Sequence, residues 1–176
     1  MKLVVSLFSL FLLSACLLLN DASEWWDKGY IDTQLIGSWK AYEEQDNSYV
    51  TIFSSGPDLV FRQYPRKATT PSSLTYDGKL KTVVLDGLTF LLVQIATRDD
   101  TGYFLIRYTL KENMLQIHTI NLDNPEVIAR YFPDVKSDDL FKIARMDKLD
   151  GEHAADLVLL FSNPANYTIR TYSKIE

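Results

Sequence analysis

The segment that decides the fold spans residues 88–121 and has the sequence LTFLLVQIATRDDTGYFLIRYTLKENMLQIHTIN. Its apolar, β-branched and aromatic runs are interrupted at 98–102 and at 111–113 by polar turn residues. Runs of this kind predict three antiparallel strands that follow one another as a meander. In the middle strand, large apolar side chains lie on both faces near its start. One face should therefore pack in a core, and the other should be partly covered.

The same pattern of short runs and turns extends to both sides of the meander. On its N-terminal side, strands are predicted at 36–42, 49–53 and 59–62, and a fourth follows the turn signal Tyr76-Asp77-Gly78. On its C-terminal side the apolar period changes to that of helices. Helices are predicted at 127–131 after the cap Asn124, at 140–144 after Ser137, and at 152–162, and an alternating strand follows at 167–172.

This order of elements predicts a mainly β fold with C-terminal helices. Eight short strands favour an antiparallel barrel or a strongly curved sheet, in which the last strand returns to the first after a helical insertion.

Gly37-Ser38-Trp39 at the start of the first strand, with Arg170 in the last, resembles the signature of the lipocalin and calycin superfamily. The resemblance implies a barrel in which the Trp39 indole packs against a basic side chain, and we expect the Arg170 guanidinium to lie over its ring. It also implies a small-molecule cavity or an inhibitory rim. The helical insertion departs from the family, and the alternative is another α+β fold with Trp39 in its core. The candidate ligand-binding residues of a barrel interior are Trp39, Tyr42, Phe53, Phe61, Phe104 and Tyr108.

The N-terminus has the pattern of a secretory leader. Lys2 precedes an apolar run at 3–13, and Leu13-Ser14-Ala15-Cys16 follows. This tetrad resembles the lipobox of bacterial lipoproteins, which implies that Cys16 is lipidated and becomes the mature N-terminus. The alternatives are an ordinary cleaved signal and a spanning helix over residues 3–19, which would have the minimum length of roughly 17 residues.

The predicted organisation is a signal peptide at 1–15, a lipidated N-terminus and tether at 16–34, and a single β-rich domain at 35–176. Trp25 and Trp26 are unusual in a tether. They could lie at the bilayer interface, but packing on the edge of the domain is the favoured interpretation.

Composition and motifs exclude several classes of function. The net charge of −5 becomes −6 without Lys2, and no cluster of basic residues is present to bind nucleic acid. Cys16 is the only cysteine, so no disulfide is expected within the chain. His118 and His153 are not spaced with carboxylates as metal ligands, and no nucleophile elbow or phosphate loop occurs. We therefore expect a non-enzymatic protein without a metal or cofactor.

Two classes of function remain. The first is an envelope lipoprotein whose barrel binds a small apolar or amphipathic molecule, and the second is an envelope interaction protein, such as an inhibitor or immunity factor, that uses a surface patch. A cavity of several hundred cubic ångströms would favour the first, and a filled barrel with an exposed aromatic patch the second.

We predict that the protein is anchored at the periplasmic face of the outer membrane. Leu17 follows the lipidated cysteine, whereas Asp at this position resembles an inner-membrane retention signal. Cell fractionation should place the native protein with outer-membrane markers and should release Cys16→Ser from the anchor. A Cys16→Ser protein that is still membrane-bound would contradict lipidation as the anchor.

Overall fold

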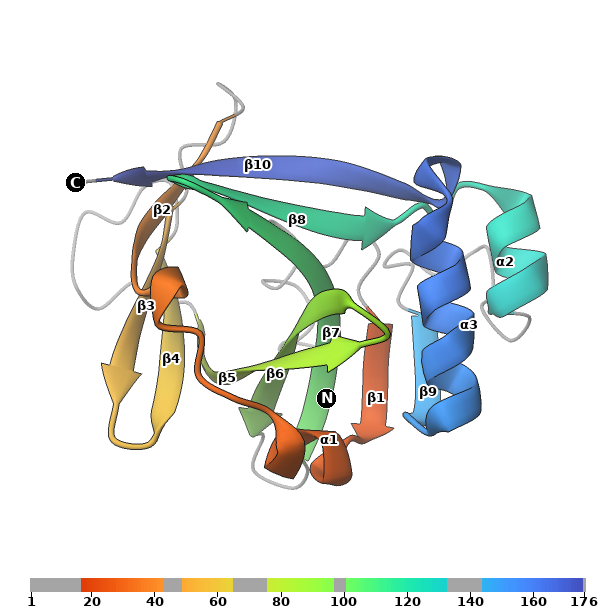
Figure 1. Ribbon diagram of the computed structural model, residues 1–176, viewed down its shortest axis with the longest axis horizontal. Helices are drawn as coiled ribbons and strands as arrows, with labels where there is room; N and C mark the ends of the chain where they lie inside the picture. The colour runs from red at the N-terminus through yellow and green to blue at the C-terminus, as the bar shows by residue number, and fades with distance from the viewer. Residues whose placement is uncertain (1–16, 43–48, 65–75, 97–100, 133–143, 176) are drawn as a thin grey trace, which may run out of the picture.

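The computed structural model describes residues 17–42, 49–64, 76–96, 101–132 and 144–175, and in these residues a ten-stranded sheet forms the fold. Eight of its strands close into an antiparallel barrel, because β6 pairs with β7 as well as with β5 (Figure 1). The predicted barrel and its eight strands are thus confirmed. The barrel strands, in order around it, are β2 (Gly37–Ala41), β3 (Tyr49–Ser55), β4 (Asp58–Tyr64), β5 (Tyr76–Leu85), β6 (Leu88–Ala96), β7 (Thr101–Lys111), β8 (Met114–Ile120) and β10 (Tyr167–Ile175), which returns to β2.

The prediction of a turn at residues 76–78 is wrong, because these residues belong to β5. Gly78 lies inside β5, opposite Phe61 of β4. A Cβ atom at Gly78 would clash with the ring of Phe61. Glycine occurs at this strand position because the absence of a side chain makes room for the Phe61 ring inside the barrel, and not because the chain turns there.

The residues expected to form a tether belong to the domain. Leu17–Asp21 forms strand β1, and Ser23–Lys28 forms helix α1. β1 pairs antiparallel with β7 and parallel with β9 (Ala144–Lys148). The side chains of Leu17 and Leu19 are only 1% and 0% exposed. The apolar run after Cys16 is therefore part of the core, which corrects the predicted boundary at residue 34.

The two tryptophans of α1 pack on the domain edge. Trp25 Nε1 donates a hydrogen bond of 2.7 Å to the carbonyl oxygen of Leu149. The Trp26 ring lies 5.9 Å from the ring of Tyr103, and the Lys81 ammonium lies 5.2 Å from the Trp26 ring. Both indoles therefore hold α1 against the sheet.

One edge of β7 is shared by two partners. Arg107–Lys111 of β7 pairs with β8, whereas Tyr103–Leu105 pairs with β1 on the same edge. β8 thus separates from β7 at Arg107, and β1 and β9 continue the sheet where β8 has left it. Each residue of β7 near this point still pairs with β6 on its other edge, so the barrel stays closed.

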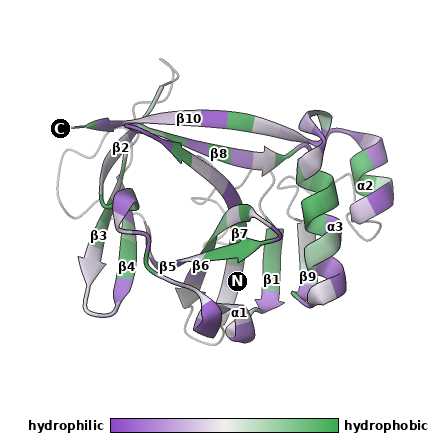
Figure 2. Ribbon diagram, in the orientation of Figure 1, coloured by the Kyte–Doolittle hydropathy of each residue, from purple (hydrophilic) through white to green (hydrophobic). Residues whose placement is uncertain are grey.

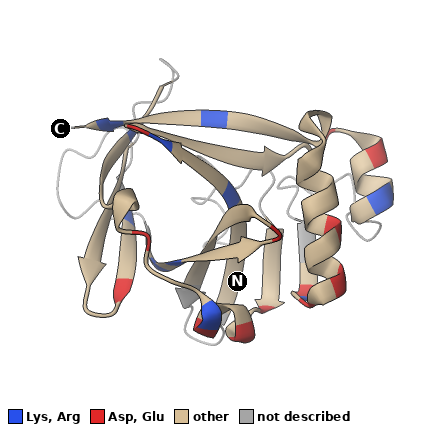
Figure 3. Cartoon of the chain, viewed as in Figure 1, with Lys and Arg blue, Asp and Glu red and all other residues tan. Residues whose placement is uncertain are grey.

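Two apolar cores lie on the two faces of the barrel wall. The inner core lies inside the barrel, and the outer core lies between its outer face and helices α2 (Pro125–Tyr131) and α3 (Gly151–Ser162). Figure 2 shows apolar stretches along α3, and Figure 3 shows acidic residues on α1, α2 and α3. The predicted cap at Asn124 is confirmed, because its side chain accepts a backbone N–H bond at the start of α2, and Asp150 accepts one in the same way at the start of α3. The helix predicted at 140–144 lies outside the described residues except Ala144, which begins β9.

The barrel closes where β10 meets β2. Lys174 stands opposite Trp39, and its ammonium lies 5.3 Å from the centre of the indole ring. Arg170 stands opposite Ile117 of β8 instead, so the expected stacking of Arg170 on Trp39 is wrong. The reason is that β2 is short and reaches only residues 172–175 of β10. Gly37, with φ of 147°, leaves the space through which Lys174 crosses the barrel end.

We predict that Trp39 is energetically coupled to Lys174 and not to Arg170. In a double-mutant cycle with Trp39→Phe, Lys174→Ala should show a coupling of about 0.5–1 kcal/mol, because a cation over an indole contributes about that much near the surface. Arg170→Ala is the matched control and should be additive with Trp39→Phe. Arg170 lies four residues, or about 13 Å, along β10 from Lys174, which is the residue opposite Trp39. The free energy of unfolding in urea measures both cycles, and a larger coupling for Arg170 would contradict the assignment.

Candidate functional site

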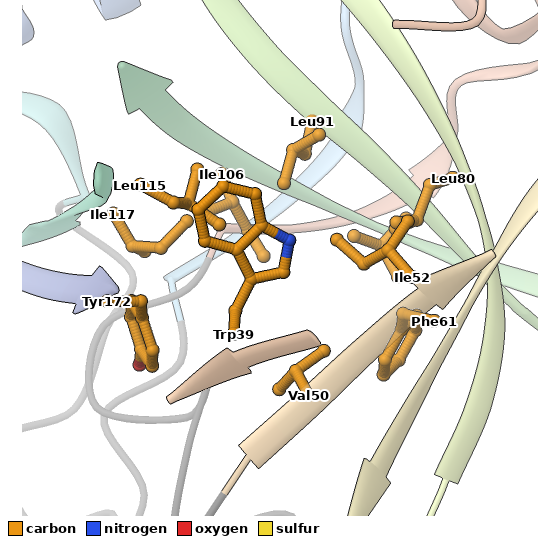
Figure 4. Close-up of a pocket in the computed structure, with 11 residues that line it drawn as sticks. Trp39, Val50, Ile52, Phe61, Leu80, Leu91, Ile106, Leu115, Ile117 and Tyr172 are labelled. Carbon is orange, nitrogen blue, oxygen red and sulfur yellow. The ribbon is translucent and has the colours of Figure 1, made fainter. Parts of the chain in front are cut away.

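The barrel interior contains an apolar cavity of about 60 Å³. Its lining side chains come from all eight barrel strands and include the Trp39 indole, whose ring lies in the middle of the group in Figure 4. The lining residues are Trp39, Val50, Ile52, Phe61, Leu80, Leu91, Val93, Ile106, Leu115, Ile117 and Tyr172.

The lining of the cavity offers apolar and aromatic contact surface. Its polar atoms belong to Trp39, whose Nε1 already donates to the carbonyl oxygen of Leu35 at 2.8 Å, and to the phenol of Tyr172. None of the eleven side chains is a carboxylate, imidazole, amine or thiol. Such a surface favours hydrocarbon or aromatic groups, which lose contact with water when they enter.

One end of the barrel is closed by the chain that precedes β2. Tyr30 forms two backbone hydrogen bonds with Thr82 of β5, and the side chain of Leu35 is fully buried in the inner core. Tyr108 of β7 reaches this segment from inside the barrel and donates a hydrogen bond of 2.8 Å to Asp32 Oδ2. Burial raises the pKa of the Tyr108 phenol, so its hydroxyl stays protonated and remains a donor. These contacts hold residues 30–36 across the barrel end.

Toward the other end of the barrel, the inner face of β10 carries polar side chains. Arg170 lies two residues from Tyr172 and is half-buried, and alternation along the strand places the two side chains on the same, inner face. Thr119 and Thr168 pair beyond Arg170 and share a hydrogen bond of 2.7 Å between their hydroxyls. The inner face of β10 therefore changes from apolar at Tyr172 to polar at Arg170.

The structure places only part of the predicted ligand set at the cavity. Trp39 and Phe61 line it. Phe104 and Tyr108 belong to the inner core but do not line the cavity, since Tyr108 is directed to Asp32. Tyr42 is 76% exposed.

Phe53 also faces outward and lies under the Arg62 guanidinium, 5.4 Å from its ring. The prediction that Tyr42 and Phe53 lie in the interior is wrong, because it depends on residue type alone. Side chains alternate along a strand, so once Trp39 and Ile52 point inward, the neighbouring parity must point out. The same rule would have found most of the cavity residues that the sequence analysis missed, including Val50, Leu91 and Val93.

His118 and Arg107 form a polar group on the outer face of the barrel, beside the end of α3. His118 is 6% exposed, its Nε2 lies 3.2 Å from the Thr109 hydroxyl, and its Nδ1 has no hydrogen-bond partner. Arg107, opposite His118, donates to the carbonyl oxygen of Phe161 at 2.7 Å and stacks on the Tyr167 ring. Burial, and then the charge of Arg107, lower the pKa of His118 to about 4.

Comparison with known proteins adds no family to this description. No protein-family model matches the chain, and no curated protein or solved structure matches it significantly. In the described residues, no three His, Cys, Asp or Glu side chains lie together as metal ligands. None of the described helices combines the length and apolar character needed to cross a bilayer.

We predict that His118 makes the protein less stable in acid. In the unfolded chain its pKa returns to about 6.5, so the unfolded state binds the proton more tightly. The His118 contribution is complete above pH 6.5 and is lost as the pH falls to 4, by on the order of 3 kcal/mol. Urea unfolding from pH 7 to pH 4 should show this loss in native protein but not in His118→Gln.

His153→Gln is the control for this experiment, because His153 lies at the exposed start of α3 and pairs with Asp150. It should keep most of the native pH dependence. Equal slopes for native protein and His118→Gln would rule out His118 as the titrating group.

Proposed function

We propose that this chain is an envelope lipoprotein whose barrel binds the apolar end of a small amphipathic ligand. The observation that carries the proposal is the cavity at Trp39, which is enclosed by side chains of apolar or aromatic character. A barrel of eight strands is just wide enough to be filled by its own side chains or to hold one small ligand.

The size of the cavity limits the ligand. A volume of about 60 Å³ holds roughly two water-sized groups and is far below the several hundred cubic ångströms of a drug-sized site. Two to three methylene groups would gain about 2 kcal/mol on burial. The cavity therefore suits the end of a chain, and the rest of the ligand must find its contacts elsewhere.

Arg170 supports an amphipathic and anionic ligand. It lies on the inner face of β10 beyond Tyr172, toward the barrel end that residues 30–36 do not close. A chain that ends beside Trp39 would extend toward this guanidinium, which suits carboxylate or phosphate groups.

The position of β1 supports a cleaved leader rather than a spanning helix. Leu17–Leu19 are paired in the sheet, so a membrane helix could use only residues 3–16. Fourteen residues are fewer than the roughly 17 needed to cross the hydrocarbon. With Cys16 as a lipid attachment site, the barrel would be held at the membrane surface, and we propose the outer membrane as its location.

A second candidate function is the binding of an envelope protein. Five of the eight large apolar side chains that are exposed in the described residues lie on or beside the adjacent strands β3, β2, β10 and β8. These five are Tyr42, Tyr49, Met114, Ile169 and Ile175. They provide a sheet face that a partner could cover.

We predict that the leaderless chain with Cys16→Ser binds decanoate through the cavity. Val93→Phe places a larger side chain in the cavity and should weaken binding measured by calorimetry by about 10- to 30-fold, the equivalent of about 2 kcal/mol. Val84→Phe is the matched control, because Val84 is exposed on β5. Arg170→Gln should weaken decanoate binding more than decanol binding.

Native mass spectrometry of the detergent-extracted protein separates the two candidate functions. A co-purifying small molecule that is lost with Val93→Phe supports the barrel site. Absence of any probe binding, together with a protein that co-purifies until Tyr42→Ser is introduced, would favour the second candidate.

A further inference from the structure

Phe61 forms one wall of the barrel cavity and stands beside a glycine. Its side chain is 3% exposed, lines the cavity, and lies between Ile52 of β3 and Gly78 of β5 in the strand ladder. Residues opposite one another on neighbouring strands have their side chains on the same face. Ile52 therefore fills the inner face on one side of Phe61, and Gly78 leaves it empty on the other. Figure 4 shows the Phe61 ring at the edge of the group of lining side chains.

The Phe61 ring uses the space that Gly78 leaves. A Cβ atom at Gly78 would meet Cε1 of the ring and would lie 3.1 Å from its Cζ. The ring thus lies over the Gly78 backbone instead of further into the cavity. Gly78 is not among the glycines with a positive φ, so its backbone conformation is open to other residues. It is the position of the ring that requires glycine here.

The ring has one other place to go. Trp39 is fixed by the hydrogen bond of 2.8 Å from its Nε1 to the carbonyl oxygen of Leu35. Phe61 has no polar atom, so packing alone decides where its ring lies. If the space over Gly78 were filled, Ile52 would block the ring on the opposite side, and the cavity would be the space left to it. The seat over Gly78 therefore keeps the cavity open.

The open cavity is still too small for a ring. Its volume is about 60 Å³, whereas an apolar cavity that holds benzene has a volume of roughly 150 Å³. An unbranched alkyl chain is thinner than a phenyl ring and needs less width. Since close-packed interiors resist additional atoms, the lining cannot widen for a ring without strain. The size of the cavity thus separates two classes of hydrocarbon.

We propose that Phe61, seated over Gly78, makes the barrel site select the unbranched end of an alkyl chain and reject branched or aromatic ends. Phe61 is the residue that determines specificity, and Gly78 is a positioning residue that acts through it. The inference rests on the function proposed above, and adds which hydrocarbon ends the cavity admits.

Calorimetry on the leaderless chain with Cys16→Ser tests the selection. The two probes are decanoate and 6-phenylhexanoate, which have about the same length and the same carboxylate but end in a chain and in a ring. This parent chain should bind decanoate at least about tenfold more tightly, because forcing a ring into a packed site costs at least that factor. Phe61→Ala should remove or reverse the preference. Phe53→Ala is the matched control and should keep it, because Phe53 of the adjacent strand β3 faces outward under Arg62.

Gly78→Ala tests the seat of the ring. It should weaken decanoate binding at least about tenfold, because the displaced ring enters the cavity. In the Phe61→Ala background the same change should have no such effect, because no ring remains to be displaced. Gly102→Ala is the control from another barrel strand, since a Cβ there would have only an ordinary contact, 3.4 Å from Leu18 Cδ1. Circular dichroism shows whether each variant is folded, and the Phe61→Ala comparison decides the proposal even where Gly78→Ala alone does not fold.

The outcomes separate this inference from the function on which it rests. If the parent chain binds neither acid, the proposed binding function has failed, and the selection fails with it. If the parent chain binds both acids equally, or if Phe61→Ala keeps the preference for decanoate, the binding function stands and the assignment of specificity to Phe61 is overturned. An equal loss of decanoate binding on Gly78→Ala with and without the Phe61 ring would overturn the role of Gly78.

Discussion

The pairing of β10 with β2 is the contact on which the barrel depends. At this junction Lys174 crosses the barrel end beside Gly37 and lies over the Trp39 indole, whose N–H binds the carbonyl oxygen of Leu35. The closure of the sheet, the segment at residues 30–36 and the centre of the inner core therefore meet at the Trp39 side chain. Gly37 is needed there because any side chain would occupy the path of Lys174 and would have to adopt a positive φ.

The second constraint is the edge of β7 that β8 and β1 share. An eight-stranded barrel alone would leave the diverging strands β7 and β8 with unpaired backbone groups, and unpaired edges are costly or prone to aggregation. β1 fills this edge and brings Leu17 and Leu19 under the helices of the outer core. The residues that directly follow Cys16 are thus part of the folded domain.

The interior of the barrel supports the proposed binding of a ligand. Its lining offers contact surface and exclusion of water, while the polar groups of the inner face lie at the ends, at Asp32 and Tyr108 on one side and at Arg170 on the other. In the proposed function, a small cavity between two polar ends would select a ligand by its length and by the charge of its head group. Its modest volume also means that affinity must come largely from the contacts outside it.

The sequence alone determined the eight barrel strands, the cap at Asn124, and the importance of Gly37 and Trp39. These features depend on alternation, turn residues and capping, which act over a few neighbouring residues. Only the tertiary structure decided that Lys174 rather than Arg170 meets Trp39, that Tyr42 points outward, and that the residues after Cys16 form β1. Each of these depends on the register between strands distant in the sequence, and an apolar run such as Leu17–Leu19 suits a leader and a buried strand equally well until its partners are known.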